Sequence, residues 1–146
     1  MAQIIDGKAL AQTIRGNLKS EVEELKKEGI KPKLAVIMVG EDKASKIYVK
    51  NKSKACEEVG IEYEEYLLKT ETTMPELLGL IKELNNNDNV HGILLQAPLP
   101  KHLDREAAFR EISPDKDVDG FNPVNVGKLC LNQDCFVSCT PNGVVK

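Results

Sequence analysis

Short apolar runs alternate with longer amphipathic segments in this chain, and that alternation limits the possible folds more than any other feature. Residues 34–39 and 90–95 are mainly apolar and have the length of strands buried on both faces. Residues 61–68 alternate loosely between polar and apolar, as a half-exposed strand does. Strands that alternate with helices are joined by crossover connections, so the sequence predicts an α/β fold with three layers, α-β-α, around a mostly parallel sheet.

The spacing of apolar side chains predicts helices between these strands. Residues 8–28 carry apolar side chains at intervals of three and four, which places them on one helix face. Asp6 is suited to cap the start of this helix, and Gly29 is suited to end it. Further helices are expected over 44–59, 75–84 and 103–112, with Gly60 ending the first of them and Pro75 near the start of the second.

The amino-acid composition of the chain changes after Ser113. The first part of this stretch is polar and rich in turn-forming residues, so we expect loops there, and loops of this length in compact domains are usually functional or disordered. Residues 139–146 resemble the start of a helix, with Pro141 at or near its first position, that stops at a domain boundary. The length of 146 residues suits one domain.

Composition excludes several classes of protein. Twenty basic and 23 acidic residues leave a net charge of −3, which argues against a nucleic-acid-binding protein. No basic leader and no apolar stretch of about eighteen residues occur, so we expect a cytoplasmic protein without a membrane span. Four cysteines without a C-x-x-C pair, and only two histidines, predict no metal site. Cys56 lies in a helical pattern and is expected to be a small core residue.

Three motifs of nucleotide and acyl chemistry are missing. The sequence has no G-x-G-x-x-G dinucleotide motif, no phosphate-binding loop ending in G-K-[ST], and no G-x-S-x-G nucleophile turn. We therefore expect no cofactor-binding residues in this chain.

Candidate site residues follow from the predicted topology. Ligands of parallel sheets bind outside the carboxyl ends of the strands. Tyr48 and Lys52 are four residues apart and share a helix face, while Gln96 directly follows the third strand. Each also has an ordinary structural explanation: Lys52 as one of several solvated lysines, Tyr48 as a packing residue, Gln96 as a strand-end cap. Asp119 could likewise serve only to stabilise the turn at Gly120.

Several sequence blocks carry a resemblance to a known family. The chain resembles, nearly end to end, the N-terminal catalytic domain of the bifunctional methylenetetrahydrofolate dehydrogenase/methenyltetrahydrofolate cyclohydrolase family, whose fold is the amino-acid dehydrogenase-like N-terminal domain. Ala97 departs from the pattern, because the family usually has leucine there. The blocks that carry the resemblance are I-D-G-K-A-L (5–10), S-K-I-Y-V-K-N-K (45–52), C-E-E-V-G-I (56–61), G-I-L-L-Q-A-P-L-P (92–100), P-D-K-D-V-D-G (114–120), N-V-G-K-L (125–129) and C-T-P (139–141).

This resemblance implies catalytic roles for four residues. Lys52 matches the general acid/base of the cyclohydrolase step, and Gln96 matches the glutamine that hydrogen-bonds this lysine. Tyr48 matches the tyrosine that stacks on the aminobenzoate ring of folate, and Asp119 matches the aspartate that holds the pterin. The substrate-binding set that the resemblance implies is Ser45, Tyr48, Val49, Lys50, Asn51, Lys52, Leu95, Gln96, Ala97, Pro98 and Asp119.

The resemblance also implies an activity and its partners. The family oxidises methylene-tetrahydrofolate with NADP or NAD and hydrolyses the methenyl product to formyl-tetrahydrofolate. On this reading, residues 1–146 are the tetrahydrofolate-binding domain, NADP is bound by a separate Rossmann domain, and the parent is a homodimer. Two alternatives remain. One is a binding module without turnover; the other is a receiver-like signalling domain, for which Glu41 and Asp42 are the only weak acidic candidates.

Overall fold

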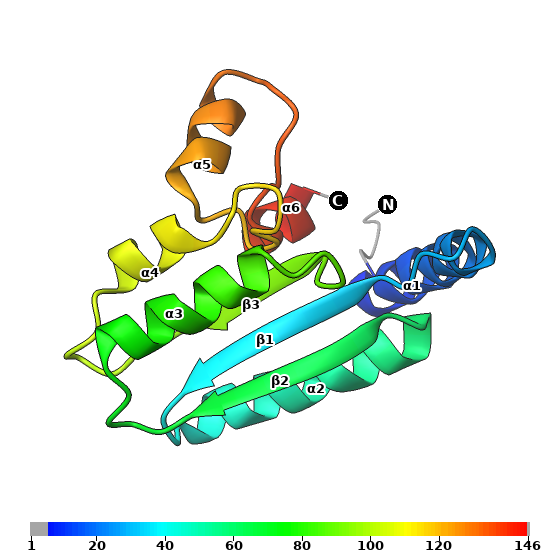
Figure 1. The fold of residues 1–146 in the computed structure, drawn as a ribbon. Helices are drawn as coiled ribbons and strands as arrows, with labels where there is room; N and C mark the ends of the chain where they lie inside the picture. The colour runs from blue at the N-terminus through cyan, green and yellow to red at the C-terminus, as the bar shows by residue number, and fades with distance from the viewer. Residues whose placement is uncertain (1–5, 146) are drawn as a thin grey trace.

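The computed structural model describes residues 6–145 and has three layers, α-β-α (Figure 1). A parallel sheet with strand order β2-β1-β3 forms the middle layer, which confirms the predicted fold class. The elements are α1 (Gly7–Lys27), β1 (Lys33–Val39), α2 (Lys43–Val59), β2 (Glu62–Leu68), α3 (Met74–Asn85), β3 (Gly92–Gln96), α4 (Arg105–Glu111), α5 (Pro123–Cys130) and α6 (Cys139–Val145).

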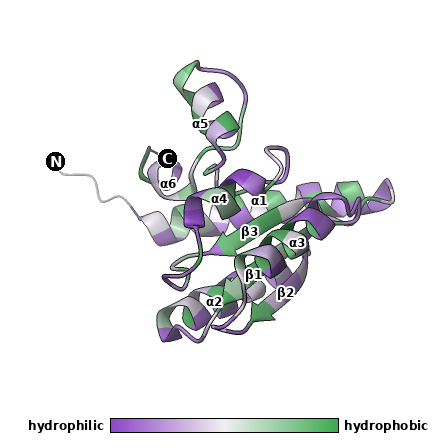
Figure 2. Ribbon diagram, turned by 60° about the vertical axis from the view of Figure 1, so that its left-hand side comes forward, coloured by the Kyte–Doolittle hydropathy of each residue, from purple (hydrophilic) through white to green (hydrophobic). Residues whose placement is uncertain are grey.

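The central strand β1 is buried on both faces, and successive side chains enter two different cores. Ile37 points to the side of the sheet covered by α3 and α4, where it packs in one cluster with Leu77 and Phe109. Met38 points to the other side and packs with Val49 of α2. The apolar residues of β3 continue both cores (green in Figure 2). The continuous apolar run in the sequence therefore reflects burial on two faces.

Local signals define most helix boundaries. The Asp6 carboxylate accepts hydrogen bonds from the backbone N–H groups of Lys8 and Ala9, at 3.1 and 3.0 Å, which confirms the predicted cap of α1. Gly60 ends α2 in the left-handed conformation, with φ of +83°. Pro75 lies in the first turn of α3, as predicted.

The apolar face of α1 is covered over only part of its length. Val22, near the carboxyl end, is buried, and Arg15 pairs with Glu58 of α2 at 3.1 Å. Leu10 and Ile14, nearer the amino end, are exposed among the described residues. The periodicity of this helix was predicted correctly, but it did not reveal where along the helix the burial occurs.

Loops were expected in the polar, turn-rich part after Ser113, but the structure forms α5 (Pro123–Cys130) there. Asn122 caps this helix, its side chain accepting the N–H of Val124 at 2.8 Å, and Pro123 follows in the first turn. Asn125 of this helix is buried, and its side chain donates to the Pro114 carbonyl at 2.9 Å. Asparagine and glycine are weak helix formers, so tertiary contacts and the cap stabilise a helix that propensity does not reveal.

Smaller differences concern the ends of predicted elements. The third strand covers Gly92–Gln96 rather than 90–95, so Gln96 is its last residue rather than the residue after it. The fourth helix is shorter than 103–112 and covers Arg105–Glu111. Within residues 6–145, no helix is long and apolar enough to cross a membrane.

Candidate active site

Lys52 and Gln96 form the centre of the candidate site. The ammonium of Lys52, in the middle of α2, donates a hydrogen bond to the side-chain oxygen of Gln96 at 2.8 Å. The Gln96 amide nitrogen donates to the Ala97 carbonyl at 2.7 Å. Because the amide nitrogen is engaged in this way, the amide oxygen faces the lysine. The lysine thus has a neutral partner in place of a carboxylate.

The amino end of α2 supports the loop that follows β3. Ser45 is buried in the first turn of α2, and its hydroxyl donates to the Ala97 carbonyl at 3.5 Å. The N–H of Ser45 donates to the Asp42 carboxylate at 2.7 Å, and this hydrogen bond lowers the pKa of Asp42. The peptide bond between Ala97 and Pro98 is cis. Ser45 therefore helps to hold the backbone next to Gln96.

A cavity of about 640 Å³ lies beside the edge strand β3, on the face of the sheet that α2 covers. Tyr48 and Lys52 line it from α2, and Asp119 lines it from the loop before α5. The other lining side chains are mainly apolar, among them Leu34 of β1, Leu94 of β3, Val118 next to Asp119, and Phe136 before α6. Its size and its few polar groups are typical of a small-molecule site.

Asp119 has a perturbed carboxyl group. Burial raises the pKa of Asp119, the positive charge of Lys52 opposes this shift, and the negative charge of Asp117 adds to it. The net effect is a pKa above the ordinary value for aspartate. A perturbed carboxyl beside a lysine in an apolar cavity is typical of a functional site.

The structure thus brings together Tyr48, Lys52, Gln96 and Asp119, which are the four predicted catalytic residues. Tyr48 is 62% exposed, so the face of its ring is accessible to a ligand. That these residues act on a substrate stays a prediction.

Several predicted substrate contacts do not have side chains on this cavity wall. Val49 packs in the core beneath α2, and Leu95 packs in the core on the opposite face of the sheet. Lys50, Asn51 and Pro98 are exposed and do not line this cavity. Helix and strand periodicity explains this result, because residues adjacent in sequence point in different directions. Any contact these five residues make with a ligand there would involve their backbone.

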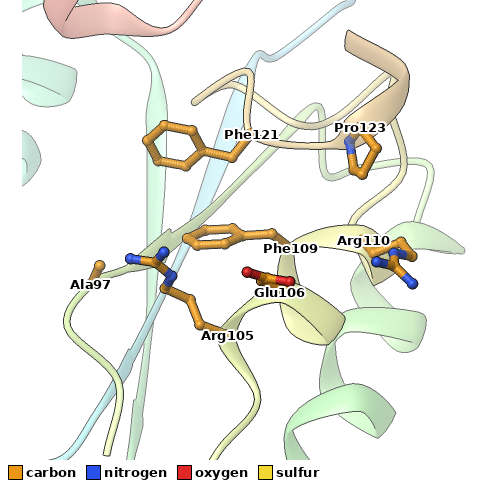
Figure 3. A pocket seen from close by; sticks show the side chains of 7 residues that line it. All are labelled: Ala97, Arg105, Glu106, Phe109, Arg110, Phe121 and Pro123. Atoms are coloured by element: carbon orange, nitrogen blue, oxygen red, sulfur yellow. The ribbon is translucent and has the colours of Figure 1, made fainter. Parts of the chain in front are cut away.

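Ala97 faces a second, smaller cavity. This cavity of about 380 Å³ lies at the carboxyl end of β3, and Phe109 and Phe121 form its apolar wall (Figure 3). The two rings meet edge to face with centroids 5.1 Å apart, and Arg105 and Glu106 lie at its border. The Ala97 side chain therefore lines a different cavity from the Lys52 side chain, and its contact with a substrate stays a prediction.

The position of the large cavity also differs from the expectation. The rule for parallel sheets placed the site at the carboxyl ends of the strands, and Gln96 does lie there. The cavity, however, extends to the amino ends of β1 and β3, where Pro32 and His91 line it. The reason is that β3 is an edge strand, and residues 118–119 and 136–140 form the remaining wall.

Residues that sequence reasoning missed come mainly from this remaining wall. Phe136, Cys139 and Thr140 line the cavity. No local pattern distinguishes Phe136, whereas Cys139 and Thr140 belong to the C-T-P block, to which no site role was assigned. Cys56 is buried, as predicted, and also borders the cavity; burial raises the pKa of its thiol. In the part of the chain described by the structure, no group of three or more potential ligand side chains is placed to hold a metal ion.

The fold and the site together define a parallel α/β domain that carries a lysine–glutamine pair on the wall of a small-molecule cavity. Residues 5–119 match the family described as tetrahydrofolate dehydrogenase/cyclohydrolase, catalytic domain, and the chain belongs to this family. This membership confirms the resemblance seen in the sequence blocks.

Individual relatives agree with this assignment. The bifunctional protein FolD of Geotalea daltonii is 54% identical over 145 residues, which cover 99% of this chain and 52% of that protein. The crystal structure of the bifunctional FolD enzyme of Campylobacter jejuni matches with a TM-score of 0.95 and 50% identity, over 96% of this chain and 50% of that one. The Trypanosoma brucei dehydrogenase-cyclohydrolase, complexed with NADP and an inhibitor, matches with a TM-score of 0.93 and 36% identity, over 99% of this chain and 50% of that one. This chain therefore spans about half the length of these relatives.

Proposed function

We propose that this chain is the tetrahydrofolate-binding catalytic domain of a bifunctional enzyme that oxidises methylene-tetrahydrofolate and hydrolyses the methenyl product to formyl-tetrahydrofolate. The observation that carries the proposal is the hydrogen bond from Lys52 to Gln96 on the wall of the large cavity, in a chain that belongs to this family.

Lys52 is the proposed general acid/base of the hydrolysis. Water attacks the bridging methenyl carbon, and the neutral amine takes a proton from that water. The resulting ammonium gives this proton to the ring nitrogen as the bond between that nitrogen and the carbon breaks. The hydroxyl left on the carbon releases its own proton to solvent as the formyl C=O forms. A lysine in water holds its proton up to about pH 10.4, so a base near neutral pH needs surroundings that do not favour the ammonium. The neutral amide of Gln96 orients the amine without the ion pair that a carboxylate would form. General acid/base catalysis of this kind contributes roughly 10²- to 10⁴-fold.

Tyr48 and Asp119 are proposed to position the substrate on either side of this lysine. The exposed ring of Tyr48 offers a flat face to the aminobenzoate ring of folate. The Asp119 carboxylate accepts hydrogen bonds from the amino-pyrimidine edge of the pterin, which it does best when ionised. The apolar lining of the cavity excludes water from the remaining pterin surface. The remaining members of the predicted substrate-binding set are proposed to act through backbone groups, apart from Ser45, which supports the loop at Ala97.

NADP does not fit the residues of this chain. The G-x-G-x-x-G dinucleotide motif is absent from the sequence, so none of the residues of this chain is proposed to hold the cofactor. We propose that a Rossmann domain elsewhere in the parent protein holds NADP, since this chain spans about half of its relatives and the Trypanosoma brucei relative is complexed with NADP. The family resemblance further supports a cytoplasmic homodimer as the parent, which analytical ultracentrifugation of the parent would test.

The decay of methenyl-tetrahydrofolate absorbance tests the proposal. The chain, its Lys52→Met variant and a Lys54→Met control, which removes an exposed lysine of the same helix, are compared with buffer alone. Faster decay with the wild type and the control, but not with Lys52→Met, supports Lys52 as the base. If the chain alone is inactive, the same variants are measured in the parent protein. Unchanged decay with Lys52→Met there would refute the proposal.

A further inference from the structure

The carboxylate of Asp117 is buried and collects three hydrogen-bond donors. Asp117 is 1% exposed. One of its oxygens accepts the backbone N–H of Phe121 at 3.3 Å, and the other accepts the N–H of Asn122 at 2.8 Å and the side-chain amide of Asn125 at 2.9 Å. A buried carboxylate is stable only when such donors surround it. These bonds close a loop of backbone from 117 to 122, and Asp119 lies within this loop.

Two further contacts leave this loop little freedom. On one side, the N–H of Ile93 in β3 donates to the Lys116 carbonyl at 2.7 Å. On the other side, Gly120 has φ of +66°, and its N–H donates to the Asp117 carbonyl at 3.1 Å. A Cβ atom at Gly120 would lie 2.7 Å from the Phe136 carbonyl oxygen, so the loop is pressed against the segment that leads into α6. The backbone on both sides of Asp119 is therefore held.

We propose that Asp117 is a positioning residue for Asp119: its hydrogen bonds hold the loop from 117 to 122, and this loop keeps the Asp119 carboxylate on the cavity wall beside Lys52. This inference rests on the proposed function and assigns a second aspartate to the pterin end of the site. Asp117 lies in the buried network and does not line the cavity itself.

Among residues 6–145, three titratable groups interact with Asp119. Lys52 approaches from α2, Cys139 from α6 and Asp117 from the same loop. The thiol of Cys139 has a raised pKa, mainly through burial, and is neutral near pH 7. We call the loss of substrate binding at low pH the acid limb. Protonation of Asp119 causes this loss, and the charges of Lys52 and Asp117 shift the pKa of Asp119 in opposite directions. Removal of the negative charge at 117 lowers the pKa of Asp119, because it removes a like charge.

The test compares Asp117→Asn with Asp115→Asn, which removes the same charge from an exposed aspartate two residues earlier. Methenyl-tetrahydrofolate hydrolysis is measured as KM and kcat across the acid range, in the chain or, if the chain alone is inactive, in the parent. We expect Asp117→Asn to raise KM by about tenfold, more than it changes kcat, because in either orientation its amide nitrogen faces at least one N–H donor that the carboxylate had accepted. We also expect the acid limb of 1/KM to move to lower pH. Asp115→Asn should do neither.

A purely structural role for Asp117 would give a different result. Circular dichroism and thermal melting report whether Asp117→Asn folds. If that variant does not fold, Asn125→Ala removes only one donor and keeps the charge, and it should raise KM without moving the acid limb. An unchanged KM with a folded variant, or an equal loss of activity at every pH without movement of the limb, would overturn the inference. In the same assay, Lys52→Met with full activity would instead refute the proposed function.

Discussion

The ammonium of Lys52 donates a hydrogen bond to the Gln96 side-chain oxygen at 2.8 Å, although 44 residues separate them in sequence. The bond joins the middle of α2 to the last residue of β3, at a point where the Gln96 amide nitrogen is already used by the Ala97 carbonyl. The lysine therefore meets an acceptor of fixed orientation and no formal charge. A positioned amine with a neutral partner suits a group that must both take and return a proton.

Replacement of Gln96 by glutamate tests the importance of this neutrality. A carboxylate in the same place would form an ion pair with Lys52 and hold it as the ammonium, so hydrolysis at pH 7 should fall by about tenfold or more. The pH optimum should also move upward. Gln96→Met, which removes the hydrogen bond without adding charge, should lower the rate without moving the optimum. A Gln96→Glu enzyme with the wild-type pH profile would contradict this prediction.

Asp119→Asn should separate binding from stability. Loss of the carboxylate should raise KM for the folate substrate roughly 10- to 100-fold, the cost of losing hydrogen bonds to a charged group. The free energy of unfolding at pH 7, in contrast, should not fall and should rise if the ionised carboxylate destabilises the fold. Because the pKa of Asp119 is raised by burial, the folded protein binds this proton more tightly than the unfolded chain, and stability falls as pH rises from the unfolded pKa of 3.8 through the folded value.

At pH 7 the ionised Asp119 therefore costs stability, and the asparagine does not carry this cost. Thermal melting at pH 7 should show an unchanged or higher Tm for Asp119→Asn. At pH 3 the advantage over the wild type should be smaller, because the wild-type carboxyl is then protonated in both states. A lower Tm at pH 7 alone would show that the carboxylate is stabilised by its surroundings.

Gly120→Ala should displace the loop that carries Asp119. The added Cβ would meet backbone atoms of Phe136 and Ser138 at 2.7 and 2.9 Å, and the positive φ disfavours any side chain. We expect a loss of about 1–3 kcal/mol in the free energy of unfolding, together with a higher KM. Gly79→Ala is the matched control, since a Cβ there has no neighbour within 4 Å in the middle of α3. It should stabilise by about 0.5–1 kcal/mol.

Lys116→Met should weaken the junction between α3 and the site loop. Lys116 is half-buried, and its ammonium donates hydrogen bonds to three carbonyl oxygens at the carboxyl end of α3. The acceptors are Leu84, Asn85 and Asn87, at 3.1, 2.8 and 2.9 Å. The loss of these bonds should cost about 1.5–3 kcal/mol in denaturant unfolding. Lys101→Met, at an exposed lysine, should leave stability within about 0.5 kcal/mol. Equal effects of the two variants would argue against a role for this contact.

Helix ends and strand burial were predictable because their causes are local. Asp6, Gly60 and Pro75 act within a few residues of their positions, and the run at 34–39 shows its burial in its own composition. The site was predictable in part for the same reason. Tyr48 and Lys52 share a face by helix geometry alone, whereas the roles of Gln96 and Asp119 came from family resemblance rather than from local pattern.

The sequence by itself determined the parallel α/β class, the limits of most helices and membership of a family, since periodicity and motif blocks can be seen along the chain. Only the tertiary structure decided which face of β3 borders the large cavity and that the Ala97 side chain lines a different one. It alone also decided that α5 forms around the buried Asn125 and that hydrogen-bond donors surround the Asp117 carboxylate. The physical reason is that a cavity wall and a buried hydrogen-bond network consist of groups distant in sequence. Their contacts form when the layers pack together, and no local pattern encodes them.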